Sequence, residues 1–343
     1  MKKLLNTLYV LGEDRYLSLD GENIVVLCGR DEIGRVPLHN IEAVAVFGFS
    51  GASPALMGAL AERGIDLSFM SPSGKFLARV CGKERGNVLL RRKQYRIADD
   101  ENQSICIARN FIAGKLYNSR WVLERAARDY PMRLDAEKLK EKADMIGKAA
   151  NRAYESENAD SLRGIEGEAA SNYFSVFDEL ILQQKEDFYF NGRNKRPPLD
   201  NVNAMLSFAY TLLSGMCAAG LEAVGLDPYV GFFHTDRPGR ISLALDLMEE
   251  LRPVFADRFV ITAINKRLIN GKDFIKKEDG AVLFTENGKK TFLKLWQERK
   301  QEEIRHPFLD EKIQWGLVPY VQALLLARHL RGDLDEYPSF MWK

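Results

Sequence analysis

The stretch NAMLSFAYTLLSGMCAAGL at residues 203–221 carries no charged side chain over 19 residues. That length is close to the ~20 apolar residues that are needed to cross a bilayer. Several serine, threonine, asparagine and tyrosine side chains lower its hydrophobicity, however. A helix that is apolar on all sides is also what the core of a helical domain requires. We therefore predict a buried core helix and no transmembrane segment.

Helical patterns surround this stretch from about residue 87 onward. Apolar residues recur there with the period of about 3.6 that is typical of amphipathic helices. We predict helices at 105–128, 136–155, 162–178, 202–224, 242–251, 253–270, 288–301 and 317–331. A basic, proline-containing loop, NGRNKRPPLDN at 191–201, separates two of them.

The N-terminal part follows a different pattern, in which short strands alternate with turns. We predict strands at 7–11, 16–19, 23–28, 35–38, 43–47, 66–70 and 76–80. Asp20-Gly21 favours a hairpin between two of them. SPALMGALAER at 53–63 predicts one helix, with Ser53 as its cap. The fold class is therefore α+β, with a small β-rich domain at 1–86 followed by a larger all-α domain at 87–343.

The composition limits the classes of function. A chain of 343 residues exceeds the size at which single cores usually stop growing, so two domains are expected. The 49 basic and 48 acidic side chains leave a net charge of +1, which excludes a protein that coats nucleic acid through its overall charge. The four cysteines have no Cys-x-x-Cys spacing. This argues against a zinc site or a disulfide framework and favours the cytoplasm.

Two short motifs concentrate the reactive side chains: LRGIEGEAASNYF at 162–174 and GFFHTDRPGRISLALDLMEELRP at 231–253. The first contains Glu166, and the second contains His234, Asp246 and Glu249. Because Asp246 and Glu249 are three residues apart on a predicted helix, their carboxylates face the same side. Mixed imidazole and carboxylate ligands suit Mg²⁺ or Mn²⁺. An ion of this kind assists phosphoryl transfer, which is the reaction class that the four residues favour.

Each of these residues has a simpler interpretation when it is taken alone. A histidine after two phenylalanines is typical of a hydrogen-bonded structural residue, and Asp246 and Glu249 are typical of a solvated helix face. Glu166 lies between Gly164 and Gly167, and a glycine in a helix costs about 1 kcal/mol relative to alanine. The close approach of another backbone or of a ligand would justify that cost.

The order of the motifs is more specific than any one motif. The segments that carry a family resemblance are LRGIEGEAASNYF, RPPLDNVNAMLSFAYTLL (196–213), His234 with GRISLALDLMEELRP (239–253), YLSLDGENIVVL (16–27), VPLHNIEAVAVFG (36–48) and SPALMGALAERGIDLSFMSPSGKFLARV (53–80). Together they resemble the CRISPR-associated spacer-acquisition integrase, the larger of the two universal adaptation proteins of those immune systems. One departure is that the family often has proline directly after its acidic unit, whereas Glu250-Leu251 intervene here. Only the local helix geometry is thereby in question.

The resemblance implies a catalytic set of four residues. Glu166, His234 and Glu249 would hold Mg²⁺ or Mn²⁺, and Asp246 would be a further acidic residue needed for activity. The implied enzyme is a metal-dependent DNA endonuclease and integrase. In its reaction, the 3′-hydroxyl of a short captured DNA attacks a phosphodiester at the leader-repeat junction and then at the far end of the repeat.

Candidate contacts to the DNA backbone are Arg163, Lys195, Arg196 and Arg240. Arg163 is three residues from Glu166 and would share its helix face, where a guanidinium can meet a phosphate through two hydrogen bonds. Arg240 is equally suited to pair with Asp236.

The implied partners are double-stranded DNA, as captured fragment and as leader-repeat, a second copy of the chain and the smaller adaptation protein. The β-rich domain is expected to dimerise, and two such dimers to form a heterohexamer with that protein, in the cytoplasm and without a membrane. Two alternatives for the function are a stand-alone metal-dependent nuclease acting on branched DNA and a non-catalytic DNA-binding scaffold. The apolar tail YPSFMWK at 337–343 would pack against its own or a neighbouring domain, or bind a partner.

Overall fold

The computed structural model describes residues 6–72, 74, 76–82 and 88–343, and the chain divides into two units. The first contains the described residues up to 82 together with Phe284–Glu302, and the second contains 88–283 and Glu303–Lys343. The division differs from the predicted 1–86 and 87–343 in one segment. Helix α9 (Glu286–Gln301) belongs to the β-rich unit, where Lys300 donates to the Thr7 hydroxyl over 2.9 Å.

The first unit contains two sheets. Its strands are β1 (Thr7–Leu11), β2 (Arg15–Asp20), β3 (Asn23–Cys28), β4 (Asp31–Pro37), β5 (Ala43–Phe47), β6 (Asp66–Met70) and β7 (Phe76–Val80). One sheet has the order β1-β5-β6-β7, in which only β6 and β7 are antiparallel, and the other is the antiparallel meander β2-β3-β4. The predicted hairpin is present, since Asp20 pairs with Asn23.

Helix α1 (Pro54–Arg63) and the 3₁₀ turn η1 (Leu38–Asn40) complete this part of the chain. The Ser53 hydroxyl accepts a hydrogen bond from the Leu56 amide, and Gly64 ends the helix in the left-handed region with φ of 68°. The cap that the sequence predicts is therefore the one that the structure uses. Leu56 and Leu60 bury the inner face of α1 in the core of the strands.

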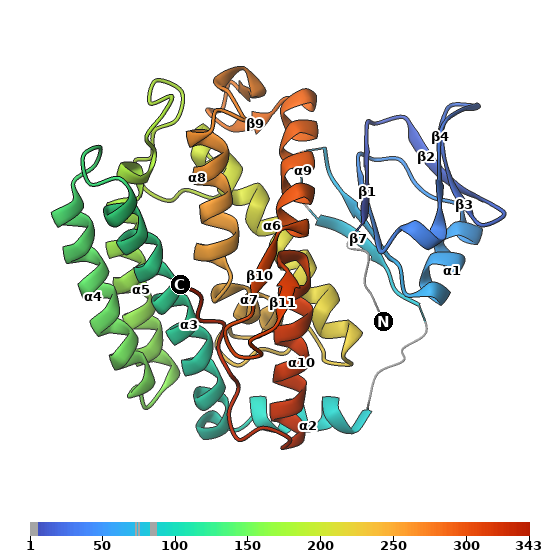
Figure 1. Ribbon diagram of the computed structural model, residues 1–343. Coiled ribbons are helices and arrows are strands. Elements are labelled where there is room, and N and C mark those ends of the chain that lie inside the picture. Colours follow the sequence, from blue (N-terminus) through green and yellow to red (C-terminus); the bar gives the residue numbers. More distant parts are fainter. Residues whose placement is uncertain (1–5, 73, 75, 83–87) are drawn as a thin grey trace. The chain divides into compact units, whose positions relative to one another are not determined.

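The second unit is mostly helical, in keeping with the predicted all-α domain except for two short hairpins. Its α-helices are α2 (Val88–Ala98), α3 (Glu101–Asp129), α4 (Ala136–Tyr154), α5 (Ala159–Ser175), α6 (Asn201–Ala223), α7 (Ser242–Glu249), α8 (Arg258–Asn265) and α10 (Val318–Arg331). Helices α3, α4 and α5 lie side by side (Figure 1).

Short elements interrupt these helices. They are the hairpins β8 (Phe274–Lys276) with β9 (Val282–Phe284) and β10 (Glu303–Arg305) with β11 (Lys312–Gln314), and the 3₁₀ turns η2 (Phe177–Leu180), η4 (Gly271–Asp273) and η5 (Trp315–Leu317). The predicted helix at 253–270 is wrong in two respects. A π-helical turn, η3 (Arg252–Asp257), precedes α8, and the helix ends at Asn265.

Helix α6 is the core helix that the uncharged stretch predicts. Within the described residues it is the one helix long and apolar enough to cross a membrane by length and composition, and 61% of its most apolar window is buried inside the protein. Asp200 caps it by accepting from the Asn203 amide over 2.7 Å. Helix α6 packs against α7, α10 and η3. It therefore supports α7, the helix that carries Asp246 and Glu249.

The C-terminal tail packs on its own unit. The Asn118 side chain donates to the Phe340 carbonyl over 2.7 Å and accepts from the Trp342 amide over 2.9 Å. The buried Glu250 accepts from the Phe340 amide over 2.8 Å and from Tyr337. The tail is therefore joined by hydrogen bonds to Glu250, which is the residue next to Glu249.

Candidate metal centre

Three elements of the helical unit bring the predicted residues together. Helix α5 carries Glu166, helix α7 carries Asp246 and Glu249, and the loop before α7 carries His234. Asp246 and Glu249 are both buried, with 0% and 3% of their surface exposed. They are therefore not the solvated helix face that was the simpler interpretation.

Asp246 acts as the anchor of the loop that carries His234. One oxygen accepts from the amides of Phe232 and Phe233 over 2.7 and 3.0 Å. The other accepts from the His234 amide over 2.9 Å and contacts the Nδ1 atom of the same ring at 2.6 Å. With its oxygens engaged in this way, Asp246 orients the histidine.

Gly231 makes this close approach of the loop feasible. A Cβ atom at this position would lie 2.8 Å from the Asp246 Oδ2 atom and 2.9 Å from the Ser242 Cβ atom. Neither group can move easily, because Asp246 is held by four hydrogen bonds and Ser242 begins α7. The glycine that opens the second motif is therefore required by packing.

His234 presents its other nitrogen toward Glu249. The Nε2 atom lies 4.0 Å from the Glu249 Oε1 atom. Because the Nδ1 atom faces the Asp246 carboxylate, this network assigns the ring proton to Nδ1 and leaves the lone pair on Nε2. This is the tautomer in which a histidine ligates a metal through Nε2.

Glu249 is held as a carboxylate by two cations. Its oxygens lie 3.0 Å from the Arg252 Nη1 atom and 2.6 Å from the Lys115 Nζ atom. Burial raises the pKa of Glu249, but the positive charges of Arg252 and Lys115 outweigh it and lower the pKa to about 2. Glu249 is therefore charged at neutral pH.

Lys115 on α3 links Glu166 to the other residues. Its ammonium group contacts an oxygen of Glu166 and an oxygen of Glu249. Burial lowers the pKa of Lys115, but Glu249 and Glu166 bring it above its ordinary value. Across 6–72, 74, 76–82 and 88–343, no three or more His, Cys, Asp and Glu residues are grouped closely enough to hold a metal ion. Here the ammonium group, a cation, lies between the two carboxylates.

The donor set nevertheless fits a hard divalent cation. Glu166 and Glu249 offer carboxylate oxygens, and His234 offers a lone pair on Nε2 that points toward Glu249. Oxygen ligands with one imidazole suit Mg²⁺ and Mn²⁺. A divalent ion bound between Glu166 and Glu249 would take the place of the Lys115 ammonium group.

The two glycines near Glu166 leave space where a side chain would otherwise begin. A Cβ atom at Gly164 or Gly167 would meet no heavy atom within 4 Å. The close approach of another backbone therefore does not account for them, and α5 is open at these two positions. Glu168, by contrast, is a surface residue that pairs with Arg152 over 2.8 Å.

The four predicted DNA contacts occupy different positions. Arg163 pairs with Asp160 over 2.5 Å and donates to the Phe233 carbonyl over 3.4 Å, next to His234. Arg240 is half-buried in the turn before α7. Lys195 and Arg196 are exposed in the loop before α6. Although the residue as a whole is exposed, partial desolvation of its ammonium group and the charges of Arg252 and Arg193 lower the pKa of Lys195.

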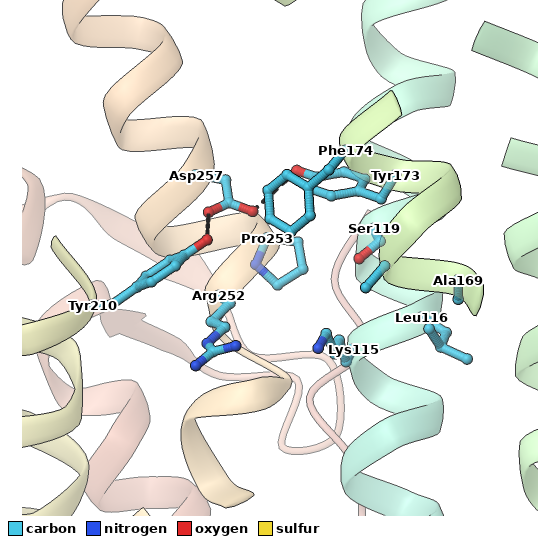
Figure 2. A pocket seen from close by; sticks show the side chains of 11 residues that line it. Lys115, Leu116, Ser119, Ala169, Tyr173, Phe174, Tyr210, Arg252, Pro253 and Asp257 are labelled. Carbon is cyan, nitrogen blue, oxygen red and sulfur yellow. Dashed lines mark hydrogen bonds between the residues drawn. The ribbon is translucent and has the colours of Figure 1, made fainter. Parts of the chain in front are cut away.

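Sequence reasoning missed a cluster that supports Arg252. The guanidinium groups of Arg252 and Arg193 lie over the Tyr210 ring, 4.8 and 5.3 Å from its centroid. The hydroxyls of Tyr210 and Tyr173 donate to the buried Asp257 over 2.6 and 3.1 Å. Figure 2 shows Arg252, Asp257 and both tyrosines lining one pocket together with Lys115. Burial raises the pKa of Asp257 to about 6, although both hydroxyls lower it.

Comparison with known proteins identifies the family. The model of the family described as "CRISPR associated protein Cas1" matches residues 8–298. A CRISPR-associated endonuclease Cas1 of Rhodospirillum rubrum is 52% identical over 347 residues, and one of Chlorobaculum tepidum is 47% identical over 343, each with all of both chains covered. The chain is therefore in the class of CRISPR-associated DNA endonucleases. Within that class, it belongs to the Cas1 family, whose members are generally metal-dependent.

Solved structures share the fold. A Cas1 protein from Thermotoga maritima has a TM-score of 0.82 at 24% identity, with 95% of this chain and 97% of that chain covered. A casposase bound to its integration product has a TM-score of 0.84 at 23% identity, with 98% and 94% covered. The predicted α+β architecture, with its β-rich beginning and mostly helical remainder, is thus confirmed.

Proposed function

We propose that this Cas1 protein is the DNA endonuclease and integrase of CRISPR adaptation, and that Glu166, His234 and Glu249 hold the Mg²⁺ or Mn²⁺ ion on which its chemistry depends. The observation that carries the proposal is the orientation of His234. Asp246 engages the Nδ1 atom, so that the Nε2 atom faces the charged Glu249. A structural histidine would not need a buried carboxylate to select the tautomer that ligates metals.

The chain's own residues then have distinct tasks in phosphoryl transfer. Asp246 positions the His234 ring, and Arg252, held over the Tyr210 ring, keeps Glu249 charged and in place. When bound, a divalent ion would stabilise negative charge on phosphoryl oxygens and lower the pKa of the attacking hydroxyl. The Glu166 side chain is 23% exposed, so a DNA strand can reach it.

The proposed reaction is a transesterification. The 3′-hydroxyl oxygen of the captured DNA forms a bond to phosphorus, and the bond from that phosphorus to the 3′-oxygen of the target strand breaks. The attacking hydroxyl loses a proton and the leaving oxygen gains one, so the number of phosphodiester bonds is unchanged. The same centre can use water as the nucleophile, which accounts for endonuclease activity.

The proposed partners are double-stranded DNA and protein. Among the solved chains of the same fold, one is a casposase with its integration product and another belongs to a Cas6-RT-Cas1–Cas2 complex. We infer that this chain acts in the cytoplasm as a homodimer, and that two dimers assemble with the smaller adaptation protein into a heterohexamer. Arg163, Lys195, Arg196 and Arg240 are proposed contacts to DNA phosphates, which fix the position of a duplex without reading its sequence.

One experiment tests the proposal against its alternatives. The protein, the smaller adaptation protein, a labelled 3′-hydroxyl duplex and a leader-repeat duplex are incubated with Mn²⁺ or with EDTA. Integration predicts a longer covalent product that forms only with Mn²⁺. Cleavage of branched DNA without that product would instead favour the stand-alone nuclease. DNA binding with no metal-dependent reaction on either substrate would favour the scaffold.

A further inference from the structure

We propose that Lys115 is a built-in competitor of the divalent ion: its ammonium group occupies the centre in the metal-free protein and must leave when an ion binds. This inference rests on the proposed metal centre. It adds a residue that sets how tightly the ion binds, whereas Glu166, His234 and Glu249 are the proposed ligands.

Lys115 is a buried cation that is paired with both carboxylates of the proposed metal centre. The residue lies in the middle of α3 in the run FIAGKLYNS (111–119), and only 8% of its surface is exposed. A buried ammonium group is costly unless it is paired. Lys115 is paired twice, with Glu166 and with Glu249 over 2.6 Å. Because these are the two carboxylates assigned to the ion, the lysine and the ion require the same oxygens.

The charge balance gives the direction of the effect. Lys115 and Arg252 place two positive charges against the carboxylates of Glu166 and Glu249. A divalent ion arriving at this neutralised centre must break both ion pairs of Lys115. Without the lysine, the two carboxylates would face each other with less compensation. Like charges that share a site repel each other, and a divalent ion relieves that repulsion.

The structure also provides a place for the displaced ammonium group. Lys115 lines a pocket together with Ser119, Tyr210 and Asp257. Figure 2 shows Lys115 and Arg252 in the lower part of this pocket and Asp257 with Tyr173 in the upper part. A lysine side chain has four rotatable bonds, so the ammonium group can turn from the carboxylates into the pocket while α3 stays in place.

The test measures the binding of Mn²⁺ to the EDTA-treated full chain by isothermal titration calorimetry. Lys115→Met keeps the length of the side chain and removes its charge. We expect this variant to bind Mn²⁺ at least about tenfold more tightly than the wild type, because no cation has to be displaced. Lys115→Arg keeps the charge and is expected to bind no more tightly than the wild type. A Lys115→Met variant with equal or weaker affinity overturns the inference.

Two further variants separate this inference from the metal centre itself. Lys138→Met removes a surface lysine that pairs with Glu179 over 3.1 Å, and its Mn²⁺ affinity is expected to equal that of the wild type. Glu249→Gln tests the centre. If the wild type and Glu249→Gln bind Mn²⁺ equally, or if no variant binds it, the metal centre is wrong and the inference falls with it. If Glu249→Gln alone weakens binding while Lys115→Met does not tighten it, only the role of Lys115 is wrong.

Thermal unfolding provides a readout that does not depend on calorimetry. Metal-free Lys115→Met should melt below the wild type, because Glu166 loses its ion pair and Glu249 loses one of two. Saturating Mn²⁺ should raise its Tm by more than that of the wild type, since tighter binding stabilises the fold more at equal ion concentration. An equal or smaller rise contradicts the inference. If Lys115→Met folds only when Mn²⁺ is present, the Mn²⁺ concentration at which it folds is measured in place of the rise in Tm.

Discussion

The substitution Asp246→Asn tests how the centre is built. Asp246 accepts four hydrogen bonds at 2.6–3.0 Å with its two oxygens, whereas an asparagine side chain has one oxygen and one NH₂ group. If the NH₂ group faces the His234 ring, the ring must accept at Nδ1 and carry its proton on Nε2, the atom that would ligate the ion. One backbone N–H group is then left without an acceptor. In the opposite orientation, the amides of Phe232 and Phe233 lose theirs.

The magnitudes follow from this geometry. A buried donor without a partner costs about 1–3 kcal/mol, so the free energy of unfolding should fall by about 1–6 kcal/mol, depending on the orientation adopted. Loss of a residue that orients a ligand typically weakens metal affinity or activity by about 10–100-fold. We therefore expect a variant that still folds at low temperature but binds Mn²⁺ at least about tenfold less tightly.

The assays are urea unfolding and calorimetric titration with Mn²⁺. Glu168→Gln is the matched control, since Glu168 lies near Glu166 in the sequence but pairs with Arg152 at the surface. Its stability and Mn²⁺ affinity should stay close to those of the wild type. If Asp246→Asn bound Mn²⁺ as tightly as the wild type, the orienting role of Asp246 would be refuted.

Three other predictions concern the surroundings of the centre. Gly231→Ala places a methyl group 2.8 Å from Asp246, so it should cost about 1–3 kcal/mol in urea unfolding and weaken Mn²⁺ binding; unchanged values for both would contradict the packing argument. Tyr337→Phe removes a hydroxyl that donates to the buried Glu250, so it should lower the free energy of urea unfolding by about 1–3 kcal/mol. An unchanged free energy would contradict the contact between the tail and Glu250. Asp257 has a pKa of about 6 in the folded protein against 3.8 ordinarily, so the folded state binds more protons than the unfolded state in this window. Its contribution to stability should therefore fall by about 2 kcal/mol between pH 4.5 and 7.5, and Asp257→Asn should remove that part of the pH dependence.

Local signals made much of the fold predictable. The change of period near residue 87 separates strands from helices, and Ser53 and Gly64 mark the ends of α1 because a cap hydroxyl and a left-handed glycine act within a few residues. The uncharged stretch could only become a core helix or a membrane span. Its moderate hydrophobicity favoured the core, where the structure places it.

Other features depend on partners that are distant in the sequence. The apolar face of α9 is visible in its pattern, but the pattern does not show that its partner is β1. The helical period continues through 253–270, although the turn at Arg252–Asp257 is π-helical. Proline at 253 was the local signal for that irregularity. π-Helical turns are frequent at functional sites.

The residues of the proposed metal centre were likewise only partly predictable from the sequence. Glu166, His234, Asp246 and Glu249 could be selected because their residue types and spacing suggest chemistry. Lys115 could not be selected, because a single lysine in a helix is usually a surface residue. It becomes important only where α3 brings it between α5 and α7. Spacing alone also could not show that the oxygens of Asp246 are engaged by the loop that carries His234.

The most direct test of the proposed metal centre is the strand-transfer reaction of His234→Ala. The variant and the wild type are compared with the smaller adaptation protein, labelled 3′-hydroxyl duplex, leader-repeat DNA and Mn²⁺, after circular dichroism has shown that both are folded. We predict covalent product from the wild type, none when EDTA replaces Mn²⁺, and none from His234→Ala. Wild-type amounts of product from folded His234→Ala would contradict the central claim.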